Sequence, residues 1–442
     1  MNKKSENYSN YNLTYSKNII KYEPKNLKEL SKIKNKKDFF FLKSGNCSYG
    51  DKSISNKTKN LVSLINFNKI IKIDKKKRTV EAESGISLYK LSKYLYQNGF
   101  FLYNVPGGLS VSLGGAIAGN VHGRFSKKNF SNFGDNLKSI KFLNNENKVI
   151  KINRGQKQFN DHIGSFGIQG IILSAELLID KIDSYNFERT EKLVKNYSDF
   201  NNIFSKNENL YGYINYLKKN SFEGIFFMLS EKPKLTKKKF GRFKNYNWPK
   251  FLSFLSIFVN NHSLKFFYNF IFYIRKYFPV RNKILSFEKV LYHSSLINLL
   301  PYFFQKGMLE IQVSINKKKF LLFYNYIKKN FIQNEIFPIF FILKKMHVSK
   351  KKYFLSFPKN NLSVSLGFRK KDYLNRQELF KNFFLFLKRN NFDVYITKNE
   401  IFNHIVDENR FLKKMKKNRK KFKMQITSIF FEKKNNNLHD LF

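Results

Sequence analysis

Glycine is scarce in this chain, with 20 among 442 residues, yet it gathers in three short segments. Residues 43–51 are KSGNCSYGD, residues 106–123 are PGGLSVSLGGAIAGNVHG, and residues 164–170 are GSFGIQG. Because glycine lacks a Cβ and tolerates positive φ, a glycine-rich loop lets several backbone N–H groups converge on a phosphate. One such loop could be a tight turn, but three in one region predict a site for a phosphate-bearing ligand.

Other kinds of chemistry find less support. The segments contain neither G-x-G-x-x-G after a strand nor G-x-x-x-x-G-K-[ST], so neither a Rossmann fold nor a P-loop is predicted. The single cysteine, Cys47, can form no internal disulfide, which is compatible with a reducing compartment. Apart from His122, the histidines show no metal-ligand spacing, and we expect no metal site; they are His162, His262, His293, His347, His404 and His439.

Short strands and helices alternate from about residue 36 to residue 180 and must position the glycine segments. Apolar runs and alternating patterns predict strands at residues 39–42, 78–82, 148–152 and 170–179. An N-cap at Ser87, leucines at 88, 91 and 95, and a stop at Asn98-Gly99 predict a helix. Residues 185–385 are predicted to mix strands with Phe-rich helices. A strand is expected at 393–397, followed by a basic helical stretch.

The charge is extreme, because 83 Lys and Arg against 31 Asp and Glu give a formal +52. Such a balance is typical of proteins that bind nucleic acid or anionic membranes. The lysines are, however, spread along the chain with Asn, Ile, Phe and Tyr, residues that A/T-rich codons specify. We therefore favour compositional bias and expect no nucleic-acid partner. The densest cluster, Lys413 to Lys423, could still dock on anionic lipid headgroups.

The most apolar region, residues 251–278, is interrupted by polar residues and has no run of the ~20 apolar residues that a spanning helix needs. It is predicted to be a buried core segment, with an interfacial or substrate-shielding pair of helices as the alternative. The N-terminus, MNKKSENYSNYN, does not resemble a signal peptide. We expect a cytoplasmic protein, with peripheral contact at the inner face of the membrane left open.

Taken together, the glycine segments resemble the FAD-binding, PCMH-type domain of the vanillyl-alcohol-oxidase type. The second segment is similar to the decaprenylphosphoryl-β-D-ribose 2′-oxidase family, a branch of the sugar and aldonolactone oxidases. The resemblance is strongest over residues 36–180 and continues more faintly afterwards. It implies an α+β fold, with a two-subdomain FAD-binding domain (1–185), a substrate domain with a mixed or antiparallel sheet flanked by helices (186–385), and a C-terminal segment returning to the flavin (386–442).

The resemblance also implies roles for individual residues. Lys398, His122 and Tyr49 would be catalytic, and Glu310, Gln312, Lys345 and Ser365 would bind substrate. FAD would be bound by three groups of residues: Lys43, Ser44, Gly45, Asn46, Cys47, Ser48, Tyr49 and Gly50; Pro106, Gly107, Gly108, Ser112, Gly114, Gly115, Ala118, Gly119, Val121, His122 and Gly123; and Gly167, Ile171 and Tyr395.

Several positions depart from the family pattern. Cys47 replaces a loop Arg and also stands where relatives with covalent flavin carry a His, so we expect noncovalent FAD. Asn46 replaces a Gly, Glu310 replaces a Gln, and Ser363 and Ser365 replace Asn and Cys. These changes affect the prediction of the substrate more than that of the cofactor.

The function implied by the resemblance is oxidation of a secondary hydroxyl of a sugar by hydride transfer to flavin N5. A polyprenyl-phosphate-linked pentose is the expected substrate, as half of an epimerisation completed by an NAD-dependent short-chain reductase. The alternatives are an aldonolactone oxidase acting on a soluble lactone, and a flavin-binding member that has lost catalysis. A charge-driven nucleic-acid or membrane-binding protein without flavin is a further alternative.

Overall fold

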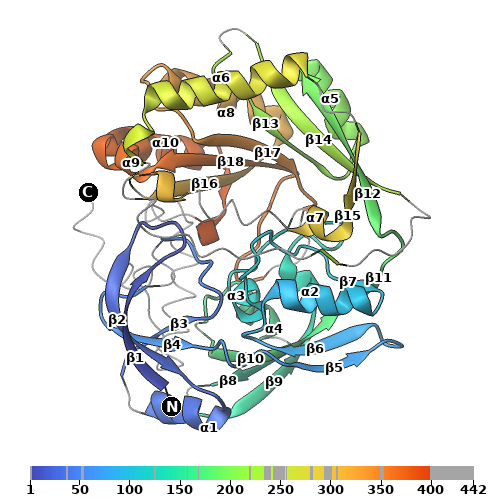
Figure 1. Ribbon diagram of the computed structural model, residues 1–442, viewed down its shortest axis with the longest axis vertical. Coiled ribbons are helices and arrows are strands. Elements are labelled where there is room, and N and C mark those ends of the chain that lie inside the picture. Colours follow the sequence, from blue (N-terminus) through green and yellow to red (C-terminus); the bar gives the residue numbers. More distant parts are fainter. Residues whose placement is uncertain are drawn as a thin grey trace.

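The computed structural model describes residues 2–35, 38–50, 54–123, 126–144, 146–156, 158–167, 169–218, 221–232, 240–241, 254, 256–278, 282–292, 301–304, 307–348 and 353–398. The Lys413 to Lys423 cluster lies outside these residues. The described chain forms two sheets that carry the glycine segments and a third, larger sheet above them (Figure 1).

The first sheet has the strand order β1-β2-β4-β3. Its elements are β1 (Asn2–Ser9), β2 (Ser16–Glu23), β3 (Phe41–Lys43) and β4 (Asn60–Ser63), with α1 (Leu27–Asn35) between β2 and β3. β4 is parallel to both β2 and β3, so the first glycine segment leaves the sheet directly after β3. The predicted strand at residues 39–42 is thus found, displaced toward the C-terminus by one to two residues.

The second sheet is antiparallel, with the order β5-β6-β10-β8-β9. Its strands are β5 (Ile70–Asp74), β6 (Thr79–Glu83), β8 (Leu137–Leu143), β9 (Val149–Asn153) and β10 (Ile171–Leu178). The helices α2 (Leu88–Gln97), α3 (Leu113–Ala118) and α4 (Phe159–His162) accompany it, and β7 (Phe100–Phe101) pairs with β11 (Asp180–Lys181). The predicted helix is confirmed, since Ser87 caps α2 by accepting from the Lys90 amide and Gly99 follows at φ +80°.

The third sheet has eight antiparallel strands in the order β15-β12-β14-β13-β17-β18-β16-β19. They are β12 (Asn186–Val194), β13 (Leu210–Ile214), β14 (Gly224–Glu231), β15 (Lys283–Ser286), β16 (Met308–Ile315), β17 (Phe340–Lys345), β18 (Leu362–Arg369) and β19 (Asp393–Val394). Its helices are α5 (Tyr197–Lys206), α6 (Asn261–Tyr277), α7 (Phe287–Leu291), α8 (Phe320–Ile327), α9 (Lys370–Asn375) and α10 (Gln377–Arg389).

The two faces of the third sheet have different neighbours. α5, α6, α8 and α10 pack on one face in a Phe-rich core that includes Ile311, Leu343 and Val364. The other face looks toward the two smaller sheets and α3 (Figure 1). Because side chains alternate along a strand, every second residue of β16, β17 and β18 is presented to the glycine segments.

Two sequence predictions need correction. Residues 393–397 do not form one strand, because β19 ends at Val394 and Ile396–Lys398 is a 3₁₀ turn. Within the described part of the region 251–278, the chain is not a buried core segment: in α6 only Leu264, Tyr268 and Phe272 are buried, while most other apolar side chains are exposed. α6 lies on the outside of the helical layer, so one stripe alone reaches the core.

Candidate flavin site

The first two glycine segments lie against each other. A Cβ built on Gly45 would lie 1.6 Å from the Ser110 carbonyl oxygen, and one on Gly108 would lie 3.9 Å from Cys47 Sγ. Only glycine allows the two backbones to approach this closely at Gly45. The loops are therefore one joint surface built from the ends of β3 and the start of α3.

The first loop is suited to a phosphate group. Among the described residues, the backbone amides of residues 45–49 donate no hydrogen bond to a protein acceptor. Asn46 and Gly50 have positive φ values of 54° and 56°, the left-handed conformation that occurs in anion-binding turns. Free amides in such a turn fit a pyrophosphate, so the residues present fit an FAD diphosphate.

The start of α3 shapes the second loop. Ser112 caps the helix by accepting from the Gly115 amide at 3.2 Å, and the Gly114 amide donates to the Ser84 carbonyl at 2.7 Å. A Cβ on Gly114 would lie 2.9 Å from Ser84 Cβ, so this glycine allows close packing rather than a free turn. Gly115, the next residue of α3, is exposed to solvent, in contrast to the closely packed Gly114.

The third glycine segment supports the second from behind. The amides of Gly164 and Phe166 donate to the carbonyls of Ile117 and Ala118 at 2.9 Å each. Gly167, with φ +82°, and the buried Ile171 continue from this contact into β10.

His162, at the end of α4 beside this segment, makes stability depend on pH. Burial lowers the pKa of His162 to about 4. In the unfolded chain its pKa is about 6.5, so between these values the unfolded state binds the extra proton. The folded state must then lose stability as the pH falls below 6.5, by about 2 kcal/mol at pH 5 for this residue.

We therefore expect His162→Phe to flatten the loss of stability between pH 7 and pH 5, as measured by urea unfolding at both values. The aromatic ring is kept because His162 packs against the Phe142 ring at 4.2 Å. The exposed His262, changed to Gln, is the control that should leave the difference unchanged. An identical pH dependence in wild type and His162→Phe would contradict the prediction.

Above the glycine loops, the third sheet presents a polar face. Ile311, Val313 and Ile315 face the Phe-rich core, so Glu310, Gln312 and Ser314 face the loops. β18 behaves alike, and its Ser363 and Ser365 lie opposite Ser314 and Gln312 in the β16–β18 ladder. This polar stripe is the part of the sheet nearest the loops.

Glu310 is the centre of a charged cluster. The Lys398 ammonium lies 2.6 Å from Glu310 Oε1, and Ser365 Oγ donates to the same oxygen at 2.9 Å. Tyr49 of the first loop also bonds to Glu310, and burial together with the Glu310 charge raises the pKa of Tyr49 well above its usual value. A neutral phenol and an ammonium thus both bind one buried carboxylate. We call Tyr49, Glu310, Ser365 and Lys398 the Glu310 cluster.

His122 binds the next polar residue of β16. His122 Nε2 lies 3.2 Å from Gln312 Oε1, while Gln312 Nε2 donates to Ser363 Oγ at 2.8 Å. This assignment of the network makes Nε2 the protonated nitrogen. Burial, with Lys344 and Lys398 nearby, lowers the pKa of His122 well below its usual value, so the ring is neutral. It packs against the Tyr395 ring at 4.9 Å.

The C-terminal turn closes the site. The Tyr395 amide donates to the Gln312 carbonyl at 2.9 Å, and Thr397 Oγ1 donates to the Gly119 carbonyl at 2.9 Å. These bonds hold Lys398 between the second loop and β16. The structure therefore brings His122 and Gln312 together with the Glu310 cluster.

Lys345 does not join them. Its ammonium donates to the Phe204 carbonyl at 2.9 Å, on the helical side of the sheet. The preceding residue, Lys344, points to the other side and donates to the Gly123 carbonyl. The strand alternation of Phe341 and Leu343 into the core is the signal that could have identified Lys344.

The N-terminal turn adds residues that sequence reasoning missed. Asn12 accepts from the Gly50 amide at 2.9 Å and donates to the Met308 carbonyl at 2.8 Å, which ties the first loop to β16. The Tyr11 ring lies 5.2 Å from the Tyr49 ring. No local motif marks these residues, although Asn is common in turns.

Comparison with known proteins identifies the cofactor. Residues 23–153 match the family described as FAD binding domain. This part of the chain is an FAD-binding domain. The predicted cofactor, FAD, and the predicted PCMH-type fold are thereby confirmed, and the matched region includes both facing glycine loops. Among the described residues, no cluster of three or more His, Cys, Asp or Glu could hold a metal ion.

Two curated relatives align with this domain. The decaprenylphosphoryl-β-D-ribose oxidase of Mycolicibacterium smegmatis is 29% identical over 133 residues, which cover 29% of this chain and 28% of that protein. L-gulonolactone oxidase 3 of Arabidopsis thaliana is 29% identical over 139 residues, which cover 29% of this chain and 24% of that protein. The matches thus span about a quarter of the length of each relative.

Solved structures extend the likeness beyond the FAD-binding domain. A solvent-stable cholesterol oxidase has a TM-score of 0.68 at 12% identity, covering 89% of this chain and 86% of that one. Cholesterol oxidase from Brevibacterium sterolicum has a TM-score of 0.63 at 11% identity, covering 83% and 80%. At such identities the likeness concerns the fold, which includes both the FAD-binding domain and the third sheet.

Proposed function

We propose that this chain is an FAD-dependent oxidoreductase that oxidises a secondary hydroxyl of a sugar. The Glu310 cluster carries the proposal, because it gathers a carboxylate, an ammonium and a neutral phenol beside the FAD-binding loops. Bound FAD would accept the hydride from the carbinol carbon. Oxidation of an alcohol to a ketone also releases one proton, so the site needs a base as well.

Glu310 is the base in this proposal and receives the hydroxyl proton. Tyr49 and Lys398 orient the substrate oxygen, and the Lys398 ammonium stabilises negative charge that develops on it. The neutral His122 holds Gln312 in place, since its Nε2 is already bound to Gln312 Oε1 and its ring packs against Tyr395 and Phe357. The role expected for His122 thus becomes a positioning one.

For the substrate we propose a polyprenyl-phosphate-linked pentose, with a soluble sugar lactone as the alternative. Each choice is supported by the name of one relative, a decaprenylphosphoryl-β-D-ribose oxidase and an L-gulonolactone oxidase. In the first case, an NAD-dependent short-chain reductase would reduce the keto product, and the pair would epimerise the sugar.

FAD is proposed to be held noncovalently. Cys47 is the residue of the first loop that could form a thioether, but burial raises the pKa of its thiol to about 12. Because the thiolate is the nucleophile, a thiol with so high a pKa attacks poorly. Release of all flavin by acid denaturation would support this proposal, and flavin that stays with the protein would contradict it.

The test compares wild type with Glu310→Gln. We expect anaerobic addition of the true substrate to bleach the flavin absorbance of the wild type. In Glu310→Gln the rate of this bleaching should be about 10²–10⁴ times lower. Both proteins should be equally yellow. Glu208→Gln, which changes an exposed carboxylate, is the matched control. Equal rates in Glu310→Gln and wild type would refute the role of Glu310.

The panel of substrates separates the alternatives. Bleaching by a lipid-phosphate pentose and not by sugar lactones supports the first substrate, and the reverse result supports the second. If light with a sacrificial donor bleaches the flavin but no sugar does so, the chain is a flavin-binding member that has lost catalysis.

A further inference from the structure

α6 exposes an apolar surface that the proposed oxidation does not use. Its buried residues recur at every fourth position, as Leu264, Tyr268 and Phe272. The opposite side carries Phe266, Phe270, Tyr273 and Tyr277, whose exposed fractions are 63%, 48%, 60% and 56%. A helix on the surface of a water-soluble domain normally has polar residues there. α6 is therefore apolar on the side that faces away from its own core.

The residues that flank α6 in the sequence include exposed apolar side chains as well. Ile257 and Phe258, in a 3₁₀ turn just before α6, are 69% and 67% exposed, and Phe278, just after it, is 70% exposed. The rings of Phe266 and Phe270 stack on each other at 5.8 Å. We call Ile257, Phe258, Phe266, Phe270, Tyr273, Tyr277 and Phe278 the aromatic ridge. So large a group of exposed apolar side chains marks an interaction surface.

The ridge forms an outer edge of the molecule. α6 lies lengthwise along the helical layer, on the far side of the third sheet from the glycine loops (Figure 1). Its 17 residues give a length of about 26 Å. Within the described residues, no helix is both long and apolar enough to cross a membrane. The geometry is that of a helix lying along a surface.

Basic residues flank the ridge. Lys276 lies beside it with its ammonium 5.1 Å from the Tyr277 ring, and Arg275 and Lys265 emerge from the same helix. Arg275 is paired with Glu191 at 3.4 Å, and Lys265 is paired with Glu335 at 3.7 Å. These two ion pairs make the net charge around α6 less positive than that of the chain as a whole. The chain still carries a formal +52, which favours an anionic partner.

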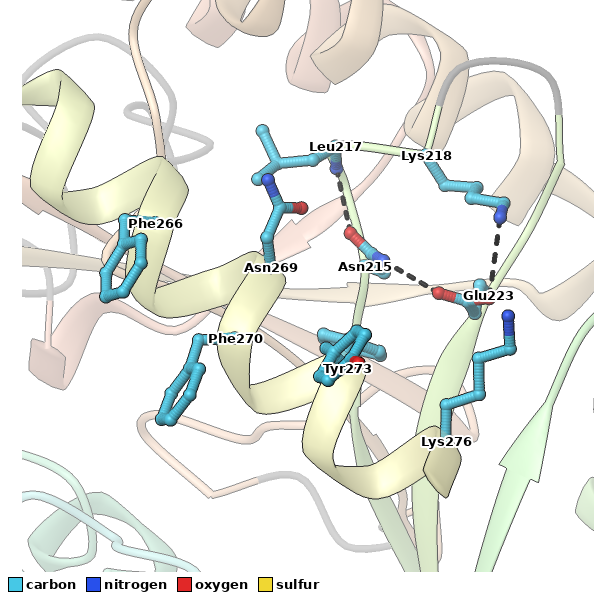
Figure 2. A pocket seen from close by; sticks show the side chains of 10 residues that line it. Asn215, Leu217, Lys218, Glu223, Phe266, Asn269, Phe270, Tyr273 and Lys276 are labelled. Atoms are coloured by element: carbon cyan, nitrogen blue, oxygen red, sulfur yellow. Dashed lines mark hydrogen bonds and ion pairs between the residues drawn. The ribbon is translucent and has the colours of Figure 1, made fainter. Parts of the chain in front are cut away.

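A groove of about 460 Å³ runs beside the ridge (Figure 2). One wall is formed by α6, through Phe270 and Tyr273, and the other by Asn215 and Glu223. The groove is separated from the Glu310 cluster by the third sheet, so it is no part of the flavin site. Its mixed apolar and polar walls suit the glycerol and headgroup zone of a phospholipid.

We propose that the aromatic ridge lies in the headgroup region of an anionic phospholipid bilayer. Aromatic side chains favour this region, and flanking lysines are attracted to anionic lipids. A second copy of the chain is a poorer occupant, because two ridges placed face to face would bring together two chains of +52 each. In this arrangement the aromatic ridge holds the protein at the membrane, with the axis of α6 parallel to the membrane surface.

The test must separate apolar insertion from simple attraction by charge. We would measure co-sedimentation of the full chain with phosphatidylglycerol–phosphatidylcholine vesicles in low salt and in 1 M NaCl, where the screening length is about 3 Å. Wild type should stay bound in high salt. Phe266→Ser combined with Phe270→Ser should weaken high-salt binding by about 10-fold or more.

The matched control is Ile71→Ser combined with Val149→Ser, which removes two side chains of similar exposure (51% and 48%) from the FAD-binding domain. It should bind vesicles as wild type does, and flavin content should show that all variants are folded. Release of wild type by high salt, or equal binding by the ridge variant, would overturn the proposal. So would a dimer in solution that the ridge variant converts to a monomer. None of these results depends on turnover, so they are distinct from a failure of the proposed oxidation.

Discussion

Replacing Lys398 by alanine is expected to slow substrate oxidation by about 10²- to 10³-fold while leaving the protein yellow. The Lys398 ammonium is 2.6 Å from Glu310 Oε1, and the Glu310 side chain is only 7% exposed. Without the ammonium, a buried carboxylate loses its countercharge and the developing charge on the substrate oxygen is no longer stabilised. Removal of such a group costs about 10²–10³ in rate. Stopped-flow bleaching of the flavin by substrate measures it.

Two further variants make this result interpretable. Lys398→Arg keeps the positive charge and should recover part of the rate, whereas a merely structural lysine would show no such dependence on charge. Lys359→Ala removes a lysine that pairs with Asp393 at 3.2 Å but is 72% exposed, and should react as wild type does. If Lys398→Ala oxidises substrate at a normal rate, the assignment of the Glu310 cluster is wrong.

A methyl group at position 45 is expected to cost the protein most of its FAD. In Gly45→Ala the new Cβ would lie 1.6 Å from the Ser110 carbonyl oxygen and 2.7 Å from the carbonyl carbon. Both are backbone atoms that cannot rotate away, so the two glycine loops must separate. Overpacking of this kind costs about 1–3 kcal/mol, which is equivalent to a loss of about 5- to 150-fold in FAD affinity if the whole cost falls on the FAD-bound state.

Titration of the flavin-free protein with FAD measures this loss. The control is Gly155→Asn, because a Cβ at Gly155 meets nothing within 4 Å and Asn tolerates its positive φ of 94° better than most residues. Gly155→Asn should bind FAD normally. Unchanged FAD affinity in Gly45→Ala would show that the contact between the loops does not hold the cofactor.

The parts of the fold that could be predicted are those encoded by neighbours in the sequence. The two ends of α2 could be predicted from Ser87 and Gly99. The glycine loops could be predicted from the concentration of glycine, the residue that close backbone approaches require. The Glu310 cluster could be located only through a resemblance, because Tyr49 and Lys398 are far apart in the chain. The link through Asn12 could not be predicted, since it depends on packing between distant segments.

Two errors have a common physical cause. The segment of α6 is rich in Phe and Tyr, which predicts that it is buried, yet within the helix only the stripe of Leu264, Tyr268 and Phe272 is buried. The resemblance indicated Lys345, although the phase of β17 presents Lys344 to the glycine loops. In both cases the composition of a segment was predictable, whereas the side that it turns to its neighbours was not.

The position of Lys398 has a consequence for synthesis of the protein. Both sheets that carry the glycine loops are complete by Leu178, so a nascent chain could build them early. Glu310 and Lys398 leave the ribosome much later, and the turn that holds Lys398 pairs with loops made long before. A growing chain can therefore form the two sheets that carry the glycine loops well before it can react with a substrate, and only the last stage of folding completes the Glu310 cluster.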